Sequence, residues 1–600
     1  MNALMIERGP DRAGCFFEGP VAFAHRRLSI IDLSDAGRQP MVSVDGRCII
    51  TFNGEIYNFR ELRAELEARG RAFATRTDTE VVLNGYAEWG LAGMLSRLDG
   101  MFAFALFDRR EGKLALGRDR FGKKPLYYLD RGARFKFASD IRAIQVTEPS
   151  LGLDYEALDF YLTELTVPQP RTIWRDVLQL RPAHYLEIDL TTGTRRSDRY
   201  WTLTFEGDSS LRVADVEDEV ERLLRRAVAK RTVADVPIGA FLSGGTDSGL
   251  VVASLAGALG AGVKTFTVGF EGDGDETAAA RRVAERYGTD HTEIIVGPDI
   301  REDLPGLVDY FGEPFADSSA VPSYYVSRAI GRHVKVALSG DGGDELFGGY
   351  HDYAWAHLTD VYLARHSSLL RPAVSAWSKV AHRMGVSSTN YGHYEAYAVR
   401  PPHLKLHREM GFAPDGAEIH GPQFPREARG FARAHLAETW RRHQRATLEQ
   451  TLSQASLETR LLNDYLVKVD RASMRSSVEV RSPFLDVDLA EFMARVAGPL
   501  KYGPEGIPKY LLRRLAARLV DVGALAAPKR GFGIPIGAWL RQQLRPMAAD
   551  LLLSGALRRS GLVRQETVER LFTEHQAGAD HTDRLWCLLV LALWLGRNLP

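Results

Sequence analysis

Cysteine is scarce in this sequence, and a long apolar run is missing. The three cysteines among 600 residues, Cys15, Cys48 and Cys587, are too widely spaced for a disulfide framework or a cysteine-based zinc site. The most apolar segment, residues 585–595, is too short to span a bilayer and is typical of a buried helix. We therefore expect a protein of a reducing compartment, the cytoplasm.

An excess of either charge is also lacking. Lys+Arg and Asp+Glu number 77 each, so the formal net charge is +0, and neither nucleic acid nor a membrane is expected as a partner. The N-terminus has charged residues and no apolar stretch, so no secretory signal is expected. Because 600 residues exceed one hydrophobic core, at least two domains are expected.

One short segment has the features of an anion-binding loop. The apolar run 236–241 predicts a buried strand, residues 249–259 predict a helix, and Ser243, Gly244 and Gly245 lie between them. Glycines let backbone N–H groups close on an oxyanion, and a helix N-terminus adds partial positive charge. Asp247 is placed to hold a phosphate-bound Mg²⁺. No G-x-x-x-x-G-K-[ST] occurs, which excludes a Walker loop; an ordinary glycine turn is the alternative.

Short strand patterns fill the first 150 residues. They cover 21–24, 28–33, 48–52, 102–107, 113–116 and 134–138. Helical patterns cover 59–69 and 79–89, the second with Thr77 or Asp78 as its cap. This mixture predicts an α+β layer fold.

Strand and helix patterns alternate farther along the chain. Strands are predicted at 265–270, 293–296 and 334–338, and helices at 276–286 and 323–330. Such alternation implies a parallel sheet with helices on both faces and ligands at the carboxyl ends of its strands. The prolines at 168, 170 and 182 and the polar stretch 191–198 predict an irregular connection before this region.

A second chemical motif follows the predicted strand 334–338. Residues 339–350 read Ser-Gly-Asp-Gly-Gly-Asp-Glu-Leu-Phe-Gly-Gly-Tyr. Three acids on so short a turn repel one another and need a cation. A solvated loop is the alternative explanation.

Taken together, these motifs resemble the glutamine-hydrolysing asparagine synthetases. The N-terminal ones are His-Arg-Arg-Leu-Ser-Ile-Ile-Asp (25–32), Phe-Asn-Gly-Glu-Ile-Tyr-Asn (52–58), Arg-Thr-Asp-Thr-Glu (76–80) and segments 99–103 and 118–122. The match continues through 242–248, 313–319, 339–350, 464–486, 509–513 and 529–539 with Gly531, Phe532 and Gly533. It implies a glutaminase domain at 1–150, a linker at 151–205 and a synthetase domain at 206–600. The implied folds are an N-terminal-nucleophile-type αββα sandwich and a parallel-sheet ATP-pyrophosphatase-like α/β domain with a helical C-terminal part.

For the first domain the resemblance implies a glutamine site. Arg27 and Asp78 would hold the α-carboxylate and α-amino group, Asn53 and Gly54 would form the oxyanion hole, and Glu55 would help to bind substrate. To bind a zwitterion, a site needs one cation and one anion at a fixed separation. To stabilise an oxyanion, it needs hydrogen-bond donors directed at the oxygen. By itself, Asn-Gly is equally typical of a hairpin turn.

The family begins Met-Cys-Gly, and its N-terminal cysteine attacks glutamine, whereas this sequence begins Met-Asn-Ala-Leu. Cys15 and Cys48 lie in strand patterns and are expected to be structural. We therefore expect glutamine hydrolysis to be absent from the chain as written. Either residues precede Met1 or the enzyme depends on ammonia.

For the second domain the resemblance implies ATP and Mg²⁺. The ATP contacts would come from Leu242, Ser243, Gly244, Gly245, Asp247, Ser248, Val268, Ser339 and Gly340. Asp247 and Asp344 would hold Mg²⁺. Lys509 would neutralise phosphate charge, and Asp341, where relatives carry Glu, would act in forming the acyl-adenylate or in its proton chemistry. Nearby Lys468, Asp470, Arg471, Glu479 and Arg481 are equally consistent with a structural ion network.

The implied reaction is asparagine formation from aspartate, ATP and glutamine or ammonia. Relatives with aspartate as acceptor can carry an Arg close to Ser318, and its absence leaves open another carboxylate acceptor in a secondary-metabolite or polysaccharide pathway. A non-catalytic nucleotide-binding subunit is the second alternative, disfavoured because Asp247, Asp344 and Lys509 are all present. The sequence leaves open whether the chain forms a homodimer.

Overall fold

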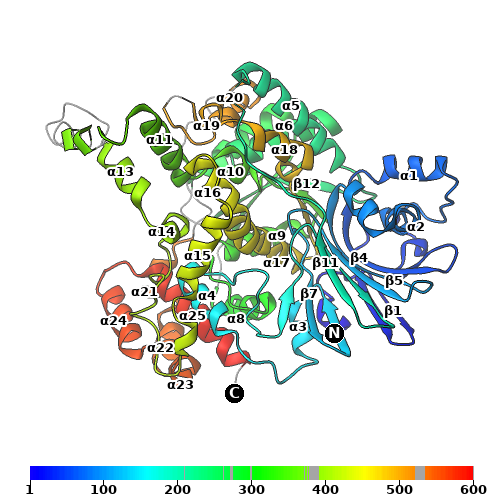
Figure 1. Cartoon of the computed structure of the whole chain (residues 1–600), viewed down its shortest axis with the longest axis horizontal. Helices are drawn as coiled ribbons and strands as arrows, with labels where there is room; N and C mark the ends of the chain where they lie inside the picture. Colours follow the sequence, from blue (N-terminus) through cyan, green and yellow to red (C-terminus); the bar gives the residue numbers. More distant parts are fainter. Residues whose placement is uncertain are drawn as a thin grey trace.

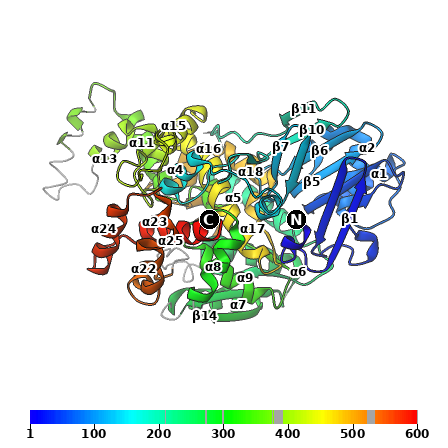
Figure 2. The ribbon, with the colours of Figure 1, turned by 90° about the horizontal axis from the view of Figure 1, so that it is seen from below.

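Antiparallel sheets form the first third of the chain and a parallel sheet forms its middle, in the computed structural model (Figure 1). The structure describes residues 1–208, 210–260, 262–270, 274–296, 300–370, 372–374, 376–377, 391–503, 505–520 and 534–598. The matched residues Gly531, Phe532 and Gly533 lie outside these ranges. We call residues 1–201 the N-terminal unit and residues 202–598 the C-terminal unit; Figure 2 shows the strands of the first beside the helices of the second.

The N-terminal unit holds three antiparallel sheets, ordered β1-β2, β11-β10-β6-β5-β4-β3 and β8-β7-β9. Its elements are β1 (Arg12–Glu18), β2 (Val21–Arg27), β3 (Met41–Val42), β4 (Cys48–Ile56), α1 (Phe59–Ala68), α2 (Asp78–Arg97), β5 (Gly100–Asp108), β6 (Lys113–Arg118), β7 (Tyr127–Arg131), β8 (Arg134–Ala138), α3 (Ile141–Gln145), α4 (Tyr155–Glu164), β9 (Val177–Gln179), β10 (His184–Asp189) and β11 (Arg195–Arg199).

Side-chain alternation along β4 and β5 explains the layers. Ile50 and Phe52 pack with α1 and α2 on one face of the six-stranded sheet. Ile49, on the other face, packs with Phe23 of β2 and Leu126. Successive strand residues point to opposite faces of the sheet, and here the residues on each face are buried against other elements. Burial of both faces is expected of a sandwich.

Two predictions for this unit are wrong. Residues 28–33 are not a strand, since the chain leaves β2 at Arg27 and continues as a loop. The stretch 191–198 is not an irregular connection: β11 pairs with β10, and β10 pairs with β6, so both extend the six-stranded sheet. Polar residues mark β11 because it is an edge strand with a solvent-exposed face.

A five-stranded parallel sheet, ordered β14-β13-β12-β15-β16, is the centre of the C-terminal unit. The strands of this sheet and the helices near them are α5 (Val213–Lys230), β12 (Ile238–Phe241), α6 (Thr246–Leu259), β13 (Lys264–Phe270), α7 (Gly274–Tyr287), β14 (Asp290–Val296), α8 (Ile300–Phe311), α9 (Ala320–Ile330), β15 (Val336–Leu338), α10 (Gly343–Phe347) and β16 (Glu479–Arg481). The predicted parallel sheet and the fold class are confirmed. Helices α5 and α6 pack on one face, and α9 packs on the other.

The described part of this unit also contains many α-helices and one π-helix. They are α11 (His351–Arg365), α13 (Tyr391–Val399), α14 (Pro402–Leu406), α15 (Phe431–Arg442), α16 (Leu448–Ser456), the π-helix η4 (Leu457–Tyr465), α17 (Leu466–Met474), α18 (Val487–Arg495), α19 (Gly498–Tyr502), α20 (Tyr510–Leu519), α21 (Ile536–Arg541), α22 (Arg545–Leu553), α23 (Ala556–Ser560), α24 (Gln565–Gln576) and α25 (Thr582–Asn598). The apolar segment 585–595 lies buried within α25, as predicted. Among the described helices, none combines the length and apolarity that crossing a membrane requires.

Candidate functional site

Two glycine-rich turns meet at the carboxyl ends of β12 and β15. These strands are parallel neighbours, so the turns that follow them reach the same edge of the sheet. A Cβ atom on Gly340 would lie 2.8 Å from the Asp247 Cβ, and one on Gly343 would lie 3.0 Å from the Asp247 Cγ. The turns therefore touch. The closeness at Gly340 leaves no room for a side chain, and at Gly343 a side chain would have to displace Asp247 slightly.

The first turn is held by its own hydroxyl groups. Gly244 has φ +70°, a conformation that glycine adopts without strain. The Ser243 backbone N–H donates to the Ser248 Oγ at 3.2 Å, and the two Oγ atoms lie 3.0 Å apart. Gly245 then caps α6 without a side chain, so N–H groups at the start of this helix stay directed into the turn.

Lys509 joins the two turns. Its Nζ lies 2.7 Å from the Asp344 Oδ1 and also contacts the Asp247 Oδ2. Burial opposes the charged form, but the two carboxylates dominate and raise the pKa of Lys509. Three residues far apart in sequence thus form one charged group, in which Lys509 is buried and the two carboxylates are half-buried.

The second turn carries three acidic residues, Asp341, Asp344 and Glu345. Ser339, which is buried, donates from its Oγ to the Asp341 Oδ2 at 2.6 Å. Burial, followed by the nearby Asp344 carboxylate, raises the pKa of Glu345 to about 7. The Tyr350 hydroxyl donates to the Glu345 Oε1 at 2.7 Å. Sequence reasoning gave no role to Glu345 or Tyr350, although both lie in the motif it quoted.

The predicted adenine contacts lie on the same edge of the sheet. Leu242 follows β12 and its N–H donates to the Phe266 carbonyl at 2.8 Å. Val268 lies farther along β13, the neighbouring strand.

Beside Ser318, where the sequence lacks an arginine, the Lys468 Nζ donates to the Asp317 Oδ2 at 2.9 Å and to the Ser319 Oγ at 2.8 Å. A cation is therefore present there, supplied by α17.

A cavity of about 500 Å³ in the N-terminal unit collects the five predicted glutamine residues. Its wall includes Arg27, Asn53, Gly54, Glu55 and Asp78. Met474 and Glu479 of the C-terminal unit complete the lining. Residues from four separate motifs thus face one cavity, and both units build it.

The predicted cation and anion of this cavity are both buried. Arg27 donates from its Nη2 to the carbonyl oxygens of Ile31 and Asp32, at 3.0 Å and 2.6 Å. The Asp78 Oδ2 accepts the Ile56 N–H at 2.9 Å, at the start of α2. Burial raises the pKa of Asp78 to about 6. Thr77 caps α2 through its side chain, so one of the two predicted caps is confirmed.

Asn53 and Gly54 are not a hairpin turn. Both lie inside β4, opposite Ala103 and Phe102 of β5. A Cβ on Gly54 would lie 2.1 Å from the Met101 carbonyl oxygen, so only glycine fits. The Asn53 Nδ2 donates to the Ser139 Oγ at 3.1 Å. The hairpin alternative is therefore excluded.

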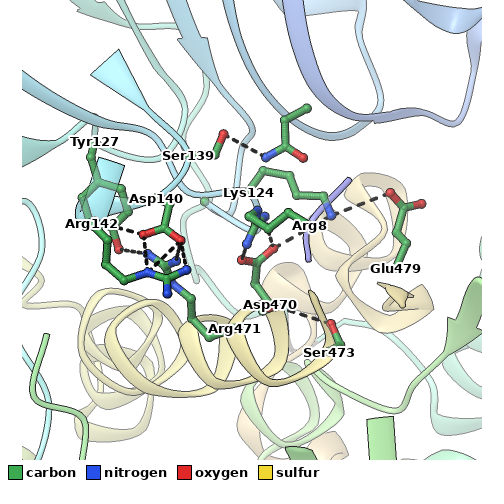
Figure 3. A network of polar contacts seen from close by, with 12 residues as sticks. Arg8, Lys124, Tyr127, Ser139, Asp140, Arg142, Asp470, Arg471, Ser473 and Glu479 are labelled. Atoms are coloured by element: carbon green, nitrogen blue, oxygen red, sulfur yellow. Dashed lines mark hydrogen bonds and ion pairs between the residues drawn. The ribbon is translucent and has the colours of Figure 1, made fainter. Parts of the chain in front are cut away.

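Buried ion pairs connect the cavity to the C-terminal unit. Arg8 binds both carboxylate oxygens of Asp470, at 2.6 and 3.0 Å, and Lys124 lies 3.9 Å from Asp470 and 3.7 Å from Glu479. Figure 3 shows Asp470 and Arg471 projecting from α17, the second toward Asp140, 3.1 Å away. The predicted ion network exists for these residues and joins the units. No sequence signal revealed Arg8 as a partner, because 462 positions separate it from Asp470.

None of the three cysteines faces the cavity. Cys15 is exposed on β1, and Cys48 and Cys587 are buried. Burial raises the pKa of both buried thiols to about 12. A thiol in this state is a poor nucleophile, so the structural role predicted for Cys48 fits its surroundings. The prediction of a half-buried Cys15 is wrong, because Cys15 is exposed on β1.

Comparison with known proteins covers both units. A family profile described as "Asparagine synthase" matches residues 219–596, and one described as "Glutamine amidotransferase domain" matches residues 1–201. The glutamine-hydrolyzing asparagine synthetase 1 of Bacillus subtilis is 32% identical over 607 residues, which cover 100% of this chain and 93% of that relative. A putative glutamine-hydrolyzing asparagine synthetase of Mycobacterium tuberculosis is 34% identical, covering 98% and 92%. Amidase chry2 of Gibberella zeae is 28% identical, covering 93% and 88%.

Proposed function

The chain belongs to the asparagine synthetase family, and on that premise we propose that it converts aspartate, ATP and ammonia to asparagine, AMP and pyrophosphate. The observation that carries the proposal is the meeting of Asp247, Asp344 and Lys509 where the two glycine turns touch. A protein that only bound nucleotide would need the first turn but not this charged group. Its presence favours catalysis.

The first step makes an acyl-adenylate. An oxygen of the aspartate side-chain carboxylate attacks the α-phosphorus of ATP, and the bond to pyrophosphate breaks. Backbone N–H groups of the Ser243–Gly245 turn, with the N-terminus of α6, hold the phosphates. The Lys509 ammonium neutralises charge on the α-phosphate and on the leaving pyrophosphate. Leu242, Val268, Ser339 and Gly340 border the space assigned to adenosine.

The residues present fit a divalent cation. Asp247 and Asp344 direct carboxylate oxygens at one point, which Lys509 also reaches. Carboxylates together with phosphate oxygens are the ligands that Mg²⁺ takes in nucleotide sites. Asp247 and Asp344 would hold the ion, which would neutralise phosphate charge when bound.

The second step forms the amide. Ammonia attacks the activated carbonyl carbon, the bond to the AMP oxygen breaks, and one proton leaves the nitrogen. Asp341, which Ser339 holds at 2.6 Å, is the carboxylate that we assign to this proton. The shorter side chain of Asp, compared with Glu, is held in place by that hydroxyl.

The cavity of the N-terminal unit is assigned to glutamine. Arg27 and Asp78 supply the opposite charges that a zwitterion needs, and Asn53 and Gly54 line the same wall. Glu55 lines it too, but its Oε2 is bound to Arg481 at 3.0 Å, which leaves it one oxygen for substrate.

The test is pyrophosphate release with Mg-ATP and aspartate, in parallel with ammonium and with glutamine. Aspartate-dependent release together with asparagine from ammonium supports the proposal. Glutamate release from glutamine reports separately on the cavity. Pyrophosphate release that does not depend on aspartate would contradict the assignment of aspartate as acceptor.

A further inference from the structure

Tyr502, the last residue of α19, lies directly behind the second glycine turn. A Cβ atom on Gly348 would lie 2.3 Å from the Tyr502 Oη and 2.4 Å from its Cζ. The phenol ring therefore occupies the space that a side chain at position 348 would need. Gly348 has φ +69°, a conformation that favours glycine, and Tyr502 is fully buried. Tyr502 thus supports the backbone of this turn from inside the protein.

Two other helices fix the Tyr502 ring in this position. The His357 ring of α11 stacks on it, with the ring centroids 4.9 Å apart and the planes at 17°. The Tyr502 hydroxyl donates to the Glu449 Oε1 of α16 at 3.3 Å. The same oxygen accepts from the Ser453 Oγ at 3.2 Å. Because the ring is buried, stacked and hydrogen-bonded, it is a rigid support for Gly348.

The backbone that Tyr502 supports in turn holds Lys509. The Gly348 carbonyl oxygen accepts the Lys509 N–H at 3.2 Å, and the Lys509 Nζ lies 2.7 Å from the Asp344 Oδ1. Asp344 lies in the first turn of α10, and Gly348 caps the C-terminus of that helix. This one short helix and its cap therefore hold Lys509 at both its backbone and its side chain.

The Lys509 backbone is strained. Its φ of +56° lies in the left-handed region, which residues other than glycine seldom adopt. Such a conformation persists where the surrounding contacts enforce it. One of these contacts is the hydrogen bond to Gly348, and another closes the chain just before Lys509, where the Ile507 N–H donates to the Tyr502 carbonyl at 2.7 Å. Tyr502 therefore acts on Lys509 through its ring and through its backbone.

We propose that Tyr502 is a positioning residue of the adenylate-forming step, because it fixes Gly348 and, through Gly348, the Lys509 ammonium. This inference rests on the proposed function, in which Lys509 neutralises charge on the α-phosphate and the leaving pyrophosphate. Such stabilisation depends on position, and a displacement of about 1 Å costs about 100-fold in rate. Loss of the ring leaves a space behind Gly348 into which the turn, and Lys509 with it, can move.

The test is aspartate-dependent exchange of labelled pyrophosphate into ATP, measured over a range of ATP concentrations. Tyr502→Leu removes the ring, whereas Tyr502→Phe keeps the ring and loses only the hydroxyl. His357→Leu removes the stacked ring and leaves Tyr502 in place. Tyr161→Leu is the control, because Tyr161 is equally buried and its hydroxyl donates to the Cys587 carbonyl at 2.8 Å, in a different hydrophobic cluster from α10.

We expect Tyr502→Leu to lower the maximal exchange rate at least about tenfold. The KM for ATP should change less than about twofold, since Lys509 acts on charge that develops in the transition state. Tyr502→Phe, which loses one long hydrogen bond, should stay within about threefold of wild type. Tyr161→Leu should keep the wild-type maximal rate at a temperature where circular dichroism shows the variants folded.

His357→Leu should lower the maximal rate by a smaller factor than Tyr502→Leu, again without a change in the KM for ATP. Because Tyr502 itself stays in place, this variant carries the test if Tyr502→Leu does not fold.

A double variant shows whether Tyr502 acts through Lys509. In the Lys509→Met background, Tyr502→Leu should lower the residual exchange less than about twofold, because the group that Tyr502 positions is already gone. A tyrosine that only stabilised the fold would lower exchange by the same factor in both backgrounds.

Four results would overturn the inference. They are equal losses in the two backgrounds, a loss confined to the KM for ATP, a loss in Tyr161→Leu as large as that in Tyr502→Leu, and a wild-type maximal rate in His357→Leu. Failure of the proposed function looks different. In that case the wild-type protein itself shows no aspartate-dependent exchange.

Discussion

The Arg481 Nη2 of the C-terminal unit lies 3.0 Å from the Glu55 Oε2 in the wall of the N-terminal cavity. Arg481 also binds Glu479, which lines the same cavity, at 3.0 Å. The wall of the assigned glutamine site is therefore an inter-unit contact. Movement of one unit relative to the other would change the site.

This pair should matter for stability. Arg481→Met leaves Glu55 buried without its counterion, which costs about 3–5 kcal/mol. We expect a lower unfolding temperature, and partial recovery in the double variant Glu55→Gln with Arg481→Met. Arg212→Met breaks a pair with Asp215 that is exposed on both sides, so it should lower the unfolding temperature much less. Equal losses from Arg481→Met and Arg212→Met would contradict the argument.

Lys509 should be needed for adenylate formation. Lys509→Met leaves Asp247 and Asp344 without their shared cation and removes charge from the assigned pyrophosphate position. Losing one such electrostatic contact costs about 100- to 1000-fold in rate. Pyrophosphate exchange measures this loss. Arg514→Met is the control, because Arg514 is exposed on α20, the helix that Lys509 precedes. A comparable loss in this variant would contradict a specific role of Lys509 in adenylate formation.

Gly349 should tolerate no side chain. A Cβ at this position would lie 1.8 Å from the Asp344 Oδ1 and 2.4 Å from the Lys509 Cε. We expect Gly349→Ala to separate these groups and to lower pyrophosphate exchange at least about tenfold. Gly257→Ala, exposed near the end of α6, should leave exchange intact and stabilise the fold by up to about 1 kcal/mol. Full pyrophosphate exchange in Gly349→Ala would contradict the prediction, because Asp344 and Lys509 would then have made room for the added methyl group.

Glu313 should make stability depend on pH. Burial raises its pKa from 4.5 to about 7, although the Ile173 N–H donates to it. Its stabilising effect is complete below about pH 4.5, where folded and unfolded chains are both protonated. It is lost as the pH rises through 7, by about 3 kcal/mol. The unfolding temperature of Glu313→Gln should fall less over this range than that of wild type or Asp309→Asn; parallel curves would contradict the prediction.

Asp78 should govern glutamine binding. Asp78→Asn keeps an oxygen for the Ile56 N–H but loses the charge assigned to the α-amino group. Hydrogen bonds to charged groups contribute about 1.5–3 kcal/mol, so glutamine affinity should fall about 10- to 100-fold by calorimetry. Asp45→Asn, on an exposed turn, should bind like wild type. Unchanged affinity in Asp78→Asn would remove Asp78 from the site.

Local patterns were sufficient for much of the fold. Apolar runs ending in glycine turns correctly placed β12, β15 and α6, because a buried parallel strand and the start of its helix have strong local signals. Short or polar strands had no such signal: β11 was taken for a connection, and the three-residue β16 was not foreseen. Pairing with neighbours, not propensity, makes those segments strands.

By itself the sequence determined the two chemical turns, the residues assigned to the glutamine cavity and the family. The two turns follow from residue type and spacing along short stretches, and the cavity residues and the family follow from the resemblance of such stretches to known proteins. Only the tertiary structure decided that Lys509 joins Asp247 to Asp344 and that Arg481 reaches Glu55. The reason is physical: ion pairing and burial depend on contacts between segments that are hundreds of residues apart, and composition or periodicity does not encode which segments meet.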